Sequence, residues 1–287
     1  MSLLPRGADE AACDCDPSFV EVGATGIEDR VELRIDADDC AGEGDLTREP
    51  ACRATAVDAL ADRDADGVRV RSSGFERCYT DDAVGLLHAA GRFAGLVEHH
   101  DAELAATART DPLAAAREAT GRTGAVGRLV GETGLAAGAE AVDGYEDALR
   151  SHDGPTIARA KIDHRLPADA RLRDTIELST GGTVRRYRTD ADSDPAALYQ
   201  LTPASASFDP AAFELLEEAA AWLAESGETG ELAPARAVRR VVDADADRTT
   251  DASIAALSTT LRKHSRGNGV LADLFADERV SDVYVTA

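Results

Sequence analysis

Two kinds of apolar spacing alternate along this chain, and together they limit the folds that are open to it. Val31, Leu33 and Ile35 alternate with charged residues, as in a strand with one buried face. Residues 81–97 instead place Val84, Leu87, Phe93 and Val97 at helical intervals, after an aspartate that suits a helix start. The mixture predicts an α+β protein built from short strands and amphipathic helices.

Composition shifts and turn signals divide the chain into four predicted parts. At 287 residues it is long enough for two small cores. The predicted parts are a cysteine-containing α/β unit over residues 1–110, a helical Gly/Ala-rich connector over 111–153, a small mixed-sheet domain with packed helices over 154–228, and a helical linker over 229–287 that ends in the first strand of a further domain.

Within the first part, a helix is expected from Cys52, followed by a hairpin whose turn is Ser72 to Gly74. Asp111-Pro112 is expected to start another helix, because aspartate caps helices and proline is tolerated at the first helical position. In the later half of the chain, the spacing of apolar residues predicts strands at 157–162, 173–178, 183–188 and 198–201, and helices at 209–226, 233–243 and 251–264.

The last residues predict a short helix that leads into a strand. Val270, Leu271, Leu274 and Phe275 have helical spacing, and Val283 and Val285 then alternate with Tyr284 and Thr286. A strand needs partners for its backbone groups, so the chain is expected to stop within a domain that begins there.

The charge balance limits the kinds of partner. There are 54 acidic residues against 31 basic ones, for a net charge of −23, while aromatic residues make up only 4 % of the chain. Because such self-repulsion is relieved by salt, the composition indicates adaptation to a salt-filled cytoplasm. It also disfavours binding to the phosphates of a nucleic acid. The sequence shows neither a long uncharged apolar run nor a signal peptide, so a cytoplasmic location is expected.

Four of the five cysteines are candidate ligands of a structural zinc ion. Cys13 and Cys15 lie beside a predicted turn, Cys40 lies in an Asp/Gly-rich loop, and Cys52 lies at a predicted helix start, where a thiolate is favoured. A closed tetrahedral zinc site needs four such ligands, although this spacing is not one of the strong zinc signatures. The alternative is that Cys52 and Cys78 are small core residues and the other cysteines are incidental.

No catalytic or cofactor-binding residue is predicted. The glycines between Gly121 and Gly138 match neither GxGxxG nor GxxxxGK[ST], so they indicate short helices with glycine caps, and this chain alone is not expected to bind ATP. The histidines lack ligand partners at suitable spacing, and His99-His100 suits a helix C-terminus better than a metal.

Four stretches resemble a known family. The sequence LADLFAD followed by ERVSDVYV, which spans Leu271 to Val285, is similar to the entry of the core of secretion ATPases that power type II secretion, type IV pili and the archaeal motility filament. The stretches Thr183 to Arg188, Leu198 to Pro203 and Phe213 to Leu216 are similar, more loosely, to the N-terminal domain of the archaeal members. The acidic composition points to the haloarchaeal branch.

The resemblance implies a non-enzymatic, truncated N-terminal region that acts in docking and in assembly of the hexamer. Its implied partners are the ATPase motor domain and the inner-membrane platform protein of the machinery, which would place it at the membrane periphery. Two other hypotheses remain: a stand-alone adaptor or regulator derived from such an ATPase, and a thiol redox protein that uses Cys13 and Cys15.

Overall fold

The protein forms two compact units. The computed structural model describes residues 13–22, 30–140, 142–163, 165–189, 197–245 and 248–284. The first unit comprises Met1–Ser72 and Cys78–Ser151, and the second comprises Ser73–Arg77 and His152–Ala287. The predicted connector, residues 111–153, therefore falls within the first unit except for its last two residues.

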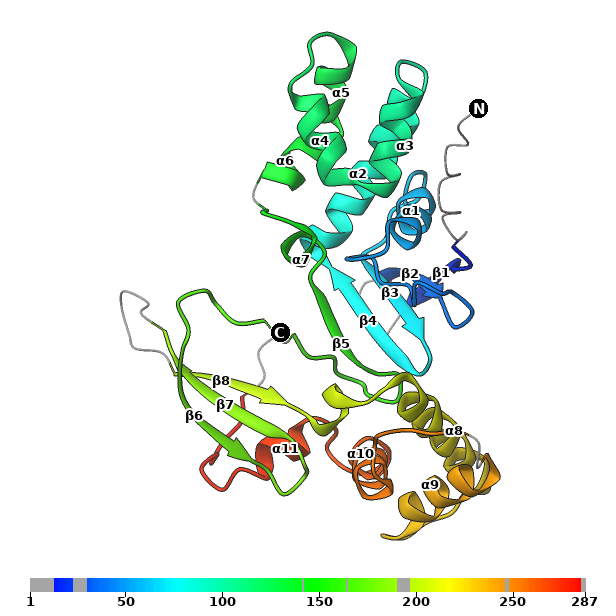
Figure 1. Ribbon diagram of the computed structural model, residues 1–287, viewed down its shortest axis with the longest axis vertical. Helices are drawn as coiled ribbons and strands as arrows, with labels where there is room; N and C mark the ends of the chain where they lie inside the picture. Colours follow the sequence, from blue (N-terminus) through cyan, green and yellow to red (C-terminus); the bar gives the residue numbers. More distant parts are fainter. Residues whose placement is uncertain are drawn as a thin grey trace, which may run out of the picture. The chain divides into compact units, whose positions relative to one another are not determined.

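A five-stranded mixed sheet has most of its residues in the first unit (Figure 1). Its strands, in the order β1-β2-β3-β4-β5, are β1 (Asp16–Val22), β2 (Arg30–Asp36), β3 (Gly67–Ser72), β4 (Phe75–Thr80) and β5 (Ser151–Pro155). β1 pairs antiparallel with β2, whereas β2 and β3 are parallel. Parallel neighbours need a crossover, and helix α1 (Pro50–Ala59) provides it.

In the described residues of the first unit, six further helices follow β4. They are α2 (Asp81–Val97), α3 (Ala102–Thr110), α4 (Pro112–Thr120), α5 (Ala125–Glu132), α6 (Leu135–Glu140) and α7 (Tyr145–Ala148). The predicted inner face of α2 is confirmed, because Val84, Leu87, Phe93 and Val97 are all buried. Alanine supplies much of the remaining core of this unit, so its helices approach one another closely. Gly91 shows how closely, because a Cβ there would lie 2.5 Å from the backbone oxygen of Val57 in α1.

The second unit combines a three-stranded antiparallel sheet with a group of helices. The strands are β6 (Arg171–Glu177), β7 (Thr183–Arg188) and β8 (Ala197–Thr202), with β7 in the centre. The short helix α11 (Leu271–Phe275) packs Val270 and Leu274 against Val184 and Leu201 of this sheet. The predicted helix at LADLFAD is thereby confirmed.

Helices α8 (Pro210–Ser226), α9 (Ala233–Ala244) and α10 (Ile254–Arg266) form the other core of the second unit. α8 starts as predicted: Asp209 accepts a hydrogen bond from the backbone N–H of Ala212, Pro210 follows, and Gly227 ends the helix with a left-handed φ of 61°.

Both lysines of the chain form ion pairs in the second unit. Lys161 Nζ lies 2.9 Å from Glu76 Oε2 and also donates to the carbonyls of Pro155 and Ala158. Lys263 Nζ lies 2.7 Å from Asp273 Oδ2, and both residues are buried. Lys263 and Asp273 thus hold α11 to α10. Lys263 is in the last turn of α10, where the helix dipole favours a positive charge, and its ammonium donates to both carboxylate oxygens of Asp273.

Several expectations differ from the structure. Residues 157–162 form no strand; they turn around Lys161, with one isolated bridge between Asp153 and Ile162. Thr80, not Asp81, is the N-cap of α2. At the predicted final strand, Val283 and Tyr284 have no regular structure, and residues 285–287 lie outside the described residues.

Candidate metal centre

The four candidate ligands reach one place from three separate segments of the first unit. Cys13 and Cys15 immediately precede β1, Cys40 lies in the loop after β2, and Cys52 is the third residue of α1. The pairing of Asp16 with Asp36 sets the start of β1 beside the end of β2, so the two N-terminal cysteines come next to the loop that carries Cys40. The first turn of α1 lies against the same loop, so the Sγ atom of Cys52 is 3.6 Å from that of Cys40.

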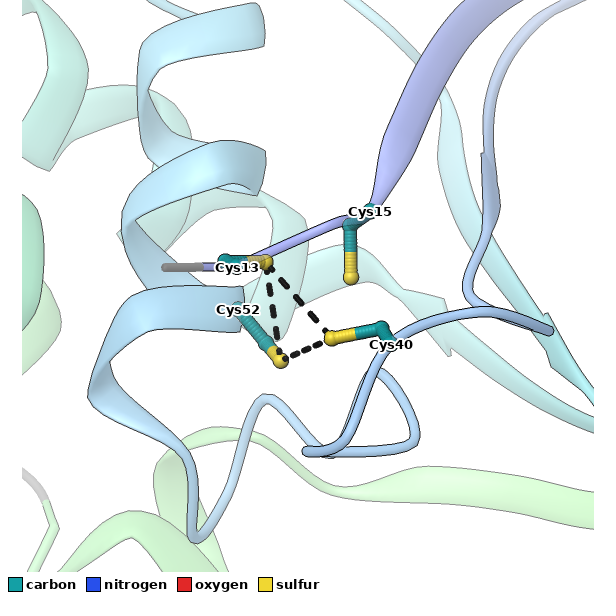
Figure 2. A group of neighbouring side chains, drawn as sticks. All are labelled: Cys13, Cys15, Cys40 and Cys52. Atoms are coloured by element: carbon teal, nitrogen blue, oxygen red, sulfur yellow. Dashed lines mark hydrogen bonds between the residues drawn. The ribbon is translucent and has the colours of Figure 1, made fainter. Parts of the chain in front are cut away.

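The sulfur atoms are spaced for a metal ion and too widely for a disulfide. Cys13 Sγ lies 3.8 Å from the Sγ atoms of both Cys40 and Cys52, and these last two lie 3.6 Å apart (Figure 2). All four Sγ atoms, including that of Cys15, are within 4.8 Å of one another, and all four cysteines are free. A regular tetrahedron of sulfurs about 2.3 Å from zinc has edges of about 3.8 Å, whereas a disulfide bond is about 2.05 Å long. The donor set therefore fits a tetrahedral thiolate-bound ion.

The site is closed on its inner side and partly open on its outer side. Cys40 and Cys52 are only 6 % and 1 % exposed, whereas Cys13 and Cys15 are half-buried. Figure 2 shows Cys13 and Cys15 on one side of the group and Cys40 and Cys52 on the other. An ion held here would have two ligands from the body of the unit, Cys40 and Cys52, and two from the N-terminal segment, Cys13 and Cys15.

Crowding makes the ionisation of the thiols unequal. Burial opposes ionisation of Cys40, but backbone N–H groups of Gly42 and Asp14 donate to its sulfur and, with the neighbouring cysteines, lower its pKa to about 7. Burial, with contributions from Cys40 and Cys13, raises the pKa of Cys52 to about 12. Burial also raises the pKa of Cys15. Because each new thiolate repels the next, a bound cation is what would let all four ionise together.

Two other residues shape the site. A Cβ on Gly42 would lie only 2.8 Å from Cys52 Sγ, so a side chain there would displace the sulfur. The Thr55 hydroxyl lies 3.3 Å from Cys13 Sγ, to which it donates, and 3.3 Å from the carbonyl of Ala51. Sequence reasoning did not identify either residue. The glycine two positions after Cys40 was the available signal.

Cys78 was left out of the predicted ligand set, and it lies apart from it. It is a half-buried residue of β4. Within the described ranges, Cys13, Cys15, Cys40 and Cys52 make up the single group of three or more His, Cys, Asp or Glu side chains with metal-binding geometry. Metal binding by this group itself stays a prediction.

Comparison of the chain with protein-family models, with curated proteins and with solved structures found no match. Among the helices that the structure describes, none combines the length and the apolar character needed to cross a membrane.

Proposed function

We propose that the four cysteines hold a structural zinc ion that fastens the N-terminal segment to the first unit. The observation that carries this proposal is the approach of four Sγ atoms to within 4.8 Å of one another from three segments. Zinc accepts four thiolates in a tetrahedral arrangement, and bound there it would supply the positive charge that four thiolates lack. With four protein ligands no coordination position is left for a substrate, which favours a structural role over a catalytic one.

Metal analysis of the purified protein tests this proposal. We expect about one zinc ion per chain in the wild-type protein, and loss of the ion in a Cys52→Ser variant. Cys78→Ser is the matched control, because it removes a thiol outside the group, and it is expected to retain the zinc. If the analysis finds iron in place of zinc, the four cysteines are still a metal site, but the metal is iron. A metal-free protein with a reversible disulfide would instead favour thiol redox chemistry at Cys13 and Cys15.

For the whole chain, we propose a non-catalytic docking and assembly role in a secretion or pilus ATPase, on the cytoplasmic side of the membrane. The support is the resemblance of LADLFADERVSDVYV and of the three shorter stretches. The three shorter stretches fall on β7, β8 and α8, and LADLFAD falls on α11; these are elements of the kinds that the resemblance implies, whereas residues 281–284 form no strand. Asp277 adds a structural detail, since it accepts from Tyr199 on β8 and from Arg279 and so holds the polar end of this motif to the sheet. The proposed partners are the motor domain and the inner-membrane platform protein, in a homo-hexamer.

Two measurements test the docking proposal. At high salt, the chain should bind a separately purified secretion-ATPase motor domain in analytical ultracentrifugation, and by itself it should hydrolyse no ATP. In source cells, an antibody against residues 13–78 should detect a product far larger than 30.1 kDa if a motor is fused to this chain. A product of 30.1 kDa that still binds the motor would favour the stand-alone adaptor. Failure to bind any motor domain would contradict both.

A further inference from the structure

A buried arginine lies next to the thiol group. Arg53 directly follows Cys52 in α1 and is 2 % exposed. Its Nε donates to the carbonyl of Leu46 at 2.7 Å and its Nη2 to the carbonyl of Thr47 at 2.9 Å, while Nη1 donates to the carbonyl of Thr110. The guanidinium also stacks 3.6 Å from the centre of the Tyr145 ring. Every one of these contacts is inside the first unit.

Burying the charge of Arg53 costs hydration free energy, so a buried arginine at this position calls for a structural explanation. In the described part of the chain, the guanidinium has no direct ion pair with a carboxylate, and its donors go to backbone carbonyls. A guanidinium held in this way gives up much of its hydration for hydrogen bonds that fix geometry, and an apolar side chain of similar size would avoid that cost. What the arginine provides is a rigid fork that joins three backbone segments.

Two of those segments carry the inner half of the metal site. Leu46 and Thr47 belong to the loop that carries Cys40, and Asp45 stiffens that loop by accepting from the N–H groups of Thr47 and Arg48. Arg53 itself belongs to α1, which carries Cys52. The fork therefore ties this loop to α1 one residue after Cys52, whose Sγ lies 3.6 Å from that of Cys40.

The third segment anchors the fork to the helical part of the unit. Thr110 ends α3, and Asp111 caps α4 by accepting from the N–H of Ala114. The Tyr145 hydroxyl donates to Asp111 at 2.6 Å and accepts from the N–H of Leu113. The ring that supports the guanidinium is thus held at both its face and its hydroxyl.

We propose that Arg53 is a positioning residue of the metal centre, which holds Cys40 and Cys52 at ligand spacing before Cys13 and Cys15 close the site. This inference rests on the proposed metal-binding function. It separates the site into an inner pair of thiols that the fold preforms and an outer pair that the N-terminal segment brings.

The test compares Arg53→Lys with Arg109→Lys. Lysine keeps the charge but lacks the fork, whereas Arg109 forms ion pairs with Asp58 and Glu98 on the surface of the same unit and does not contact the loop. Zinc affinity is measured by competition with a chromophoric chelator, and ligand geometry by the thiolate charge-transfer bands of the cobalt-substituted protein. We expect Arg53→Lys to lower zinc affinity about 10- to 100-fold and to alter the cobalt spectrum. Arg109→Lys should change neither.

A second readout needs no metal. In a Cys13→Ser/Cys15→Ser background, mass spectrometry follows the rate at which iodoacetamide modifies Cys40 and Cys52, and Arg53→Lys is expected to raise that rate about tenfold, on the order of the loss in affinity. If the wild-type protein binds no metal, the proposed function fails while this readout still tests the positioning role. Unchanged affinity, spectrum and labelling in a less stable Arg53→Lys protein would overturn the inference. Should that variant not fold, Tyr145→Phe, which loses only the hydroxyl anchor, is expected to shift the same readouts in the same direction.

Discussion

Removing the metal, or replacing Cys52 with serine, is expected to lower the free energy of unfolding of the first unit by more than about 4 kcal/mol. The ion would join the N-terminal segment, the loop after β2 and α1, so all three lose a shared anchor at once. Hydrogen exchange at the amides of β1 and β2 measures the loss within the unit. Trp222, the only tryptophan of the chain, lies in α8 of the second unit, and its fluorescence transition serves as an internal reference.

The controls separate metal binding from packing. Cys78→Ser should unfold like the wild type, and a chelator should bring the wild type to the stability of Cys52→Ser. Because Cys52 is only 1 % exposed, the serine also introduces a buried hydroxyl. If the wild type and Cys52→Ser differ by the same amount with and without zinc, the cysteine contributes through packing and the metal proposal is wrong.

Replacing Asp273 with asparagine is expected to destabilise the second unit by about 3–5 kcal/mol, because it leaves the ammonium of Lys263 buried without its counter-charge. Asparagine has nearly the same shape, so the change reports the charge and not a cavity. Chemical denaturation followed by Trp222 fluorescence measures the effect, since the tryptophan packs against the core that α8, α9 and α10 share.

A double variant and a surface variant complete this experiment. Lys263→Met/Asp273→Leu removes both charges and should recover most of the lost stability. Glu218→Gln, which breaks an exposed pair with Arg248, should cost less than about 1 kcal/mol. If the double variant is as unstable as Asp273→Asn, the ion pair itself is not what holds α11 in place.

Helix starts and central strands could be predicted because their signals are local. Asp111-Pro112 and Asp209-Pro210 cap their helices through bonds that span three residues, and both aspartates do so in the structure. In β2 the buried Leu33 and Ile35 alternate with charged residues, so the period of a half-buried strand is visible in the sequence. The α+β class follows from these elements and is the class observed.

Helices, strands and turns that depend on tertiary contacts could not be predicted from the sequence. β1 has the sequence DPSFVEV, in which two apolar residues are adjacent and a proline stands near the start, and it is a strand because β2 provides its partner. Ile157 has the apolar character of a strand residue, but it packs against the core of α8 while the chain turns around Lys161. The burial of Asp273 could not be predicted from the sequence either, because only the tertiary structure brings Lys263 beside it.

The sequence by itself indicated thiols as candidate metal ligands, the exclusion of Cys78, the excess of acidic residues and the order of most helices and strands, because these depend on composition and on contacts a few residues apart. The tertiary structure alone decided that Cys13, Cys15, Cys40 and Cys52 meet, that Gly42 must lack a side chain beside Cys52, and that Arg53 ties the loop to α1. The physical reason is distance along the chain. Cys13 and Cys52 are 39 residues apart, and only strand pairing and the packing of α1 fix their sulfurs 3.8 Å from each other.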